Sequence, residues 1–67
     1  MDIGSALRRQ REVAGISQSR LAKETGIKQQ TISRWESNMH TPDIEHCIIL
    51  AKYYGITLEE LLDIDLP

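Results

Sequence analysis

The sequence predicts an all-α fold, a compact bundle of five short helices in one domain that spans residues 1–67. Apolar residues recur at spacings of three and four, and a capping residue precedes most of these segments. No segment of the sequence alternates apolar and polar residues as a half-buried strand does. The chain has 67 residues, 40% of them hydrophobic, and is near the smallest size at which a side-chain core alone stabilises a fold.

The first two helices are bounded by clear signals. The first is expected over residues 3–14, between Asp2 as its N-cap and Gly15 as its terminator. The second is expected to start after Ser17, a second N-cap, and to bury Leu21 and Ala22. Helical spacing gives the first helix an inward face made of Ile3, Ala6, Leu7 and Val13.

The third and fourth helices are separated by a polar loop. Gly26 allows the left-handed turn that leads to the third helix, which is expected over residues 29–37 and is ended by Asn38. Thr41-Pro42 is expected to open the fourth helix, with Pro42 at its first helical position, and Gly55 to end it after residue 54.

The fourth and fifth helices complete the predicted core. The predicted inward face of the fourth helix consists of Cys47, Ile48, Leu50, Ala51 and Tyr54, which leaves Ile49 and Tyr53 outside. In the segment TLEE, Thr57 and Glu60 form a capping box that starts the fifth helix. The inward residues of the fifth helix are expected to be Leu58, Leu61 and Leu62.

Several classes of protein do not fit this sequence. No run is long and apolar enough for a membrane span, and we expect no signal peptide. Cys47, the single cysteine, lies in the apolar run HCIIL, which favours a buried thiol over a nucleophile and fits a reducing cytoplasm. His40 and His46 lack the companions of a zinc site, and no glycine-rich phosphate loop is present. We therefore expect no enzyme activity, cofactor, metal or small-molecule ligand.

Charge is divided unevenly along the chain. Residues 1–38 hold seven basic and four acidic side chains, a net charge of +3. Residues 39–67 hold one basic and six acidic side chains, a net charge of −5. Such a division suits an interface with an anionic partner on one side, although an ordinary solvated surface also carries charges of this kind.

Residues 18–37 have the spacing of two short helices that cross at a tight turn. Counted from Gln18, the small residue Ala22 is fifth and Gly26 is ninth, while the apolar Ile32 and Trp35 are fifteenth and eighteenth. This pattern places a small side chain where the helices approach and pins the second helix to the first by its apolar side. Its opposite face, which holds Gln29, Gln30, Ser33 and Arg34, must remain exposed.

The segments ISQSRLAKETGI, QQTISRWES and LEELL resemble the helix-turn-helix domain of the lambdoid phage repressor and Cro family, the Xre-like regulators. The resemblance covers roughly residues 3–62. It implies a cytoplasmic protein, bacterial or phage-encoded, that binds duplex DNA sequence-specifically. The simplest such protein is a repressor at an inverted-repeat operator.

The resemblance also implies roles for individual side chains. The third helix would read base edges in the major groove through Lys28, Gln29, Gln30, Ser33 and Arg34. The chemistry agrees, because a glutamine amide matches adenine and an arginine guanidinium matches guanine. Backbone phosphates would be contacted by Ser17, Gln18, Arg11, Ser37, Asn38 and His40.

Three further positions follow from the comparison with this family. Arg11 and Glu36 would form an ion pair between the first and third helices, the alternative being two independently solvated charges. Lys28 stands where relatives often carry a capping Ser or Thr, a loss of about 1 kcal/mol that a DNA contact would offset. Asn38 replaces a commoner glycine.

Two interpretations concern partners. Family members usually bind DNA as symmetric dimers. The candidate dimer contact in this chain includes residues 57–67. Its side chains, which the core is not expected to need, are Ile49, Tyr53, Leu58, Ile64 and Leu66. A scattered exposed Ile49 without a partner is the alternative. A different function is also open at this point: a small helical protein-interaction module, such as an antitoxin-type protein, that uses its acidic C-terminal half.

Overall fold

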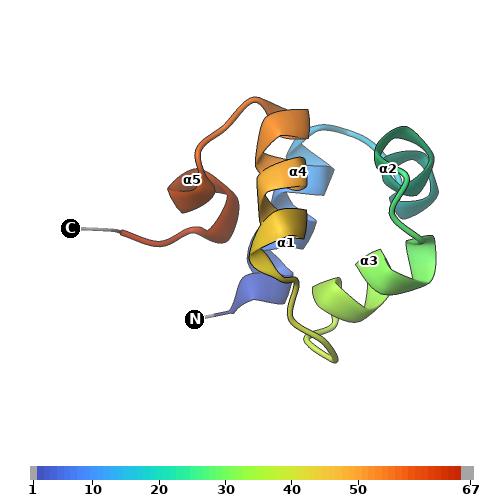
Figure 1. Ribbon diagram of the computed structural model, residues 1–67, viewed down its shortest axis with the longest axis horizontal. Helices are drawn as coiled ribbons and strands as arrows, with labels where there is room; N and C mark the ends of the chain where they lie inside the picture. The colour runs from blue at the N-terminus through green and yellow to red at the C-terminus, as the bar shows by residue number, and fades with distance from the viewer. Residues whose placement is uncertain (1, 66–67) are drawn as a thin grey trace.

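The computed structural model describes residues 2–65, and within that range it contains five α-helices and no strand. The helices are α1 (Ile3–Val13), α2 (Gln18–Thr25), α3 (Gln29–Glu36), α4 (Ile44–Tyr54) and α5 (Leu58–Leu62). In Figure 1, α2 and α3 lie at one end of the molecule and α5 at the other, with α1 and α4 between them. The all-α prediction is confirmed.

Most helices start at the capping side chains that were predicted from the sequence. The side chains of Asp2 and Ser17 accept hydrogen bonds from the backbone N–H groups of Ser5 and Arg20. Thr57 and Glu60 form the predicted reciprocal capping box of α5. Asn38 takes a left-handed conformation with φ of 61°, as expected for the residue that ends the α3 segment.

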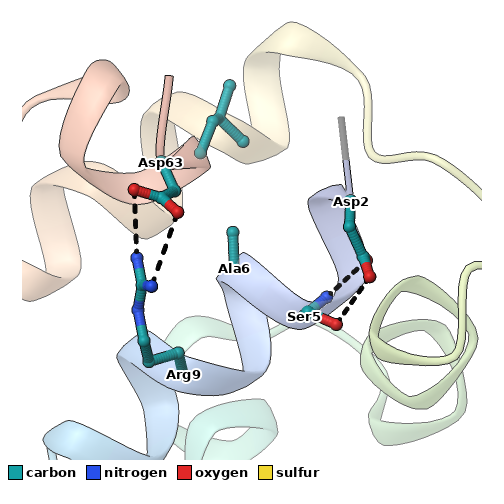
Figure 2. A pocket seen from close by; sticks show the side chains of 6 residues that line it. Asp2, Ser5, Ala6, Arg9 and Asp63 are labelled. Atoms are coloured by element: carbon teal, nitrogen blue, oxygen red, sulfur yellow. Dashed lines mark hydrogen bonds and ion pairs between the residues drawn. The ribbon is translucent and has the colours of Figure 1, made fainter. Parts of the chain in front are cut away.

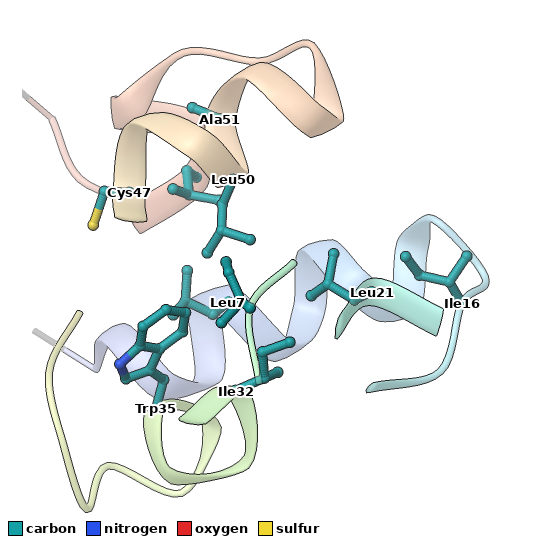
Figure 3. Packing of buried hydrophobic residues seen from close by; sticks show 10 residues of the cluster. Leu7, Ile16, Leu21, Ile32, Trp35, Cys47, Leu50 and Ala51 are labelled. Carbon is teal, nitrogen blue, oxygen red and sulfur yellow. The ribbon is translucent and has the colours of Figure 1, made fainter. Parts of the chain in front are cut away.

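The core lies where the five helices converge, and side chains from α1, α3 and α4 point toward one another there (Figure 3). Because no helix here exceeds 11 residues, each depends on this packing rather than on its own propensity. The buried cluster consists of Leu7, Ile16, Leu21, Ile27, Ile32, Trp35, Cys47, Leu50, Ala51 and Leu61.

Three predictions about helix placement and burial are wrong. Pro42 is not the first residue of α4: it is buried before the helix, and Asp43 caps α4 by accepting from the backbone N–H of His46. Val13 is 77% exposed, because the last turn of α1 extends beyond the core. Ile48 is 41% exposed, so the inward face of α4 is narrower than its apolar sequence indicates.

The expectation that Tyr53 lies outside the core is also wrong, and Leu58 faces inward, as the spacing of α5 predicted, rather than being left for a partner. Both side chains are half-buried and pack against the core cluster. The Tyr53 hydroxyl also donates a hydrogen bond to the Glu24 carboxylate, which is paired with Arg20 at 2.6 Å and joins α4 to α2. Ile49 and Ile64 are 41% exposed and half-buried, respectively, and Leu66 lies outside the described residues.

Candidate nucleic-acid interface

The turn between α2 and α3 is held by one threonine and one glycine. The Thr25 hydroxyl donates to the Leu21 carbonyl at 2.7 Å and accepts from the Ile27 N–H at 3.3 Å. Gly26 caps α2 with φ of 77°, a backbone conformation that costs a residue with a Cβ atom. Because Leu21 and Ile27 are both buried, the turn fixes the angle at which α3 leaves α2.

The buried side of α3 determines which side chains it presents. Ile32 and Trp35 are inserted in the core, as Figure 3 shows, so the opposite face of the helix is turned to solvent. Within residues 2–65, none of the side chains on that face takes part in a hydrogen bond or an ion pair. They are Lys28, Gln29, Gln30 and Ser33, which are exposed, and Arg34, which is half-buried.

The N-terminus of α3 lacks a side-chain cap. Lys28 occupies the N-cap position in extended backbone, and its side chain makes no capping hydrogen bond. A serine or aspartate there would satisfy one of the open N–H groups, worth about 1 kcal/mol. The expectation of a lost cap is therefore confirmed, and the first turn of α3 keeps unsatisfied donors next to a lysine.

The start of α1 is docked on the end of α3. The Gly4 N–H donates to Asn38 Oδ1 at 3.0 Å, and Asn38 Nδ2 donates to the Asp2 carboxylate at 2.8 Å. A Cβ atom at Gly4 would lie 2.6 Å from the Trp35 carbonyl oxygen, closer than real Cβ contacts. Glycine at this position therefore lets α1 approach the backbone of α3.

Asp2 is strongly acidic in this arrangement. The Ser5 backbone N–H, the Asn38 amide and the Ser5 hydroxyl all donate to its carboxylate and hold its pKa at about 2, below the ordinary 3.8. The carboxylate form is thus the one that caps α1 and orients the Asn38 side chain.

Glu36 connects three helices through one carboxylate. Arg11 Nε and Nη2 donate to its two oxygens at 2.8 and 2.9 Å, and Gln18 Nε2 donates to Oε1 at 3.1 Å. The side chains of Arg11 and Glu36 are only 13% and 5% exposed. The Glu36 carboxylate raises the pKa of Arg11, so the guanidinium stays charged. Through Gln18, the pair also fixes the side chain at the start of α2.

The side chains predicted to contact phosphate differ in how many of their hydrogen-bonding groups are still free. Arg11 directs Nε and Nη2 to Glu36 and Nη1 to the Ile16 carbonyl at 2.9 Å, and the Asn38 amide is bonded on both sides. The Ser37 hydroxyl donates back to carbonyls of α3. By contrast, Ser17 and His40 are exposed, and Gln18 retains a second amide N–H.

The rest of the described surface offers little for catalysis. A hollow of about 270 Å³ lies between α1 and α5, lined by Asp2, Ser5, Ala6, Arg9, Leu62 and Asp63, and an exposed Arg9–Asp63 ion pair spans it (Figure 2). Residues 2–65 hold no cluster of metal-ligating side chains, and Cys47 is buried, which raises the pKa of its thiol. None of the helices described is long and apolar enough to traverse a bilayer.

Comparison with known proteins identifies the fold. The sequence profile of the helix-turn-helix family matches residues 7–61. The chain belongs to the Xre/Cro-like helix-turn-helix family. The match spans the whole of α2, α3 and α4, most of α1, and α5 except for its last residue, and it contains Gln18, Glu36 and the exposed face of α3.

Two relatives are transcription regulators. The HTH-type transcriptional activator BcrR of Enterococcus faecalis is 29% identical over 62 residues, which cover 92% of this chain but only 30% of that protein. An uncharacterised HTH-type transcriptional regulator of Methanocaldococcus jannaschii is 29% identical over 51 residues, covering 76% of this chain and 77% of the relative. No solved structure matched the chain significantly. The family match and the names of both relatives support a DNA-binding transcription regulator.

Two features of the site were not predicted from sequence. Gly4 gives no sequence signal, because its close approach depends on where the end of α3 lies. The bond from Gln18 to Glu36 had a partial signal, since both residues were singled out, but only Arg11 was expected as a partner of Glu36.

Proposed function

We propose that this chain is a sequence-specific regulator that inserts α3 into the major groove of duplex DNA, binds an inverted-repeat operator as a dimer and represses transcription by occupying a promoter. The observation that carries the proposal is the outer face of α3. Its side chains are unbonded within residues 2–65, while the opposite face is locked in the core by Ile32 and Trp35.

Base reading follows from the chemistry of that face. A glutamine amide offers one donor and one acceptor group, which match adenine N6 and N7, so Gln29 and Gln30 are suited to A·T pairs. Arg34 matches the two acceptors of guanine. Lys28 and Ser33 complete the set of proposed base contacts. A contact from Lys28 to DNA would offset the stability that α3 loses because its start has no side-chain cap.

Phosphate binding is supported best at the start of α2. There the second amide N–H of Gln18 and the open backbone N–H groups of the helix are available to an anion, and the exposed Ser17 hydroxyl, which accepts from the Arg20 N–H, can still donate. His40 adds an exposed contact beyond α3, and Ser37 contributes only as an acceptor or after rotation of its hydroxyl. In this proposal Arg11 and Asn38 keep their contacts within the chain and offer phosphate only the N–H groups that these contacts leave, two on Arg11 and one on Asn38.

Binding-site selection from random duplexes followed by substitution tests the proposal. Replacing Gln29 or Gln30 by Ala should each lose about 1–3 kcal/mol on the selected site and barely change binding to unrelated duplex. Gln18→Ala should weaken specific and unrelated duplexes together, because phosphates carry no sequence information. Equal weakening on all duplexes by the Gln29 and Gln30 variants would refute the assignment of base contacts.

The dimer part of the proposal predicts the form of the operator. One α3 covers a few base pairs, so two domains related by a two-fold axis would read half-sites roughly 34 Å apart on one face of the duplex. Selected sites should be inverted repeats. Inserting about five base pairs between the halves should abolish joint occupancy, because it rotates one half-site to the opposite face.

Two simpler assays separate the remaining alternatives. Retention on a heparin column that falls steeply with salt supports DNA binding, whereas flow-through at low salt would favour a protein-interaction module built on the acidic half. A promoter–reporter assay should show reduced output. Increased output would replace repression by activation, the role named for the Enterococcus relative.

A further inference from the structure

Helix α4 carries apolar residues outside the face that packs in the core. Cys47, Leu50 and Ala51 are buried, yet Ile48 and Ile49 on the outer side are each 41% exposed. A helix with apolar residues around most of its circumference is normally covered by other elements. Within residues 2–65 nothing covers this outer side, so it is a candidate contact surface.

Charged residues stand on both sides of the isoleucine pair. Glu45, Ile48, Ile49 and Lys52 follow one another at the spacing i, i+3, i+4, i+7, which places all four on one face of α4. Glu45 and Lys52 are exposed, and neither takes part in an ion pair within the part of the chain described. We name these four residues the α4 stripe.

The α4 stripe is complementary to itself. If two copies of α4 pack antiparallel about a two-fold axis between Ile48 and Ile49, each residue lies opposite the one at the same distance on the other side of that axis. The four isoleucines then meet at the centre. Glu45 lies opposite Lys52 of the second copy, and the same pair forms a second time. A parallel arrangement would instead oppose like charges.

We propose that the α4 stripe is the surface through which a second copy of this chain docks. The inference rests on the proposed function, since it assigns the contact of the proposed operator-bound dimer. It keeps Ile49 of the surface expected from sequence and moves the contact onto α4, because Tyr53 and Leu58 pack against their own core. A contact of one 11-residue helix per copy is smaller than a standard interface of about 800 Å² per partner, so association should be weak and strengthened by DNA.

Charge reversal tests the pairing directly. Glu45→Lys and Lys52→Glu should each weaken self-association, measured by sedimentation equilibrium, by about tenfold or more, because each places two like-charge contacts in the dimer. An equimolar mixture of the two variants should recover association, since in the mixed dimer both contacts are again between opposite charges. Glu12→Lys, the same charge change at an exposed position of α1 away from the stripe, is the matched control and should leave association unchanged.

Several results would overturn the proposal. These are single reversals that leave association unchanged, a mixture no better than either variant alone, or a wild-type chain that neither self-associates nor binds two half-sites cooperatively. Circular dichroism checks that the exposed substitutions leave the fold intact. Binding to a duplex with a single half-site tests the proposed function separately: if it persists in both variants while association is unaffected, only the α4 stripe is refuted.

Discussion

Replacing Glu36 by Ala is expected to remove a large part of the stability of the domain. The substitution deletes the acceptor of two hydrogen bonds from Arg11 and one from Gln18, at 2.8, 2.9 and 3.1 Å. Arg11, 13% exposed, would keep its charge with the Ile16 carbonyl as its one remaining partner. Breaking a buried pair in this way costs about 3–5 kcal/mol, and the partial exposure of Arg11 favours the lower end, about 3 kcal/mol.

The loss is large for a chain of 67 residues, for which stability of about 3–10 kcal/mol is typical. Urea unfolding followed by tryptophan fluorescence measures it, because Trp35 is the only tryptophan and is buried. The matched control is Glu12→Ala, which breaks a pair with Arg8 at 3.5 Å whose side chains are 57% and 62% exposed, and should cost about 0–1 kcal/mol.

A double variant separates burial of charge from loss of packing. Arg11→Met combined with Glu36→Leu removes both charges and should recover most of the lost stability, because apolar residues of similar size replace buried ion pairs at little cost. If Glu36→Ala costs no more than Glu12→Ala, the Arg11 guanidinium is well hydrated and the pair does not organise the three helices.

Four other substitutions are expected to change the stability of the domain, or its pH dependence, in different directions. Gly4→Ala should destabilise by about 1–3 kcal/mol in thermal melting despite the better helix propensity of alanine, because its Cβ would meet the Trp35 carbonyl at 2.6 Å; a stabilised variant would refute the close approach. Tyr54→Phe should leave stability unchanged or raise it by up to about 1 kcal/mol in urea, because the Tyr54 hydroxyl is buried without a partner among residues 2–65; a clear loss would reveal one. Lys28→Ser should stabilise by about 1 kcal/mol and yet weaken operator binding in a mobility-shift assay, whereas tighter binding would exclude a lysine contact. The pKa of Asp2 is about 2 when folded, below the ordinary 3.8, so its contribution is present above pH 4 and lost as the pH falls toward 2; Asp2→Asn should melt with a smaller pH dependence over that range, and an unchanged profile would contradict the low pKa.

Local chemistry made the helix boundaries predictable. Ser17, Thr57 and Gly26 each serve a backbone need that exists within one turn, so their positions could be read from the sequence alone. At the start of α4 two such signals competed, and the Asp43 cap determined the boundary while Pro42 was buried before it.

Long-range geometry explains what the sequence did not reveal. Ile48 belongs to an apolar run in which more positions are hydrophobic than one helix face can hold, so periodicity cannot select the buried ones. Val13 matches the inward spacing but lies beyond the end of the core. The candidate base-reading face was predictable because Ile32 and Trp35 fix its opposite side, whereas the docking of Gly4 depends on the position of a segment more than 30 residues away.

The shortness of α2 and α3 links recognition to protein turnover. Eight residues are too few for a helix to persist in water alone, so the candidate base-reading face exists only while the whole bundle is folded. A duplex that binds this face stabilises the folded state and so lowers the fraction of unfolded molecules. Proteases degrade the unfolded molecules. Molecules on an operator should therefore outlive those in solution, and the number of occupied sites would help to set how much regulator the cell retains.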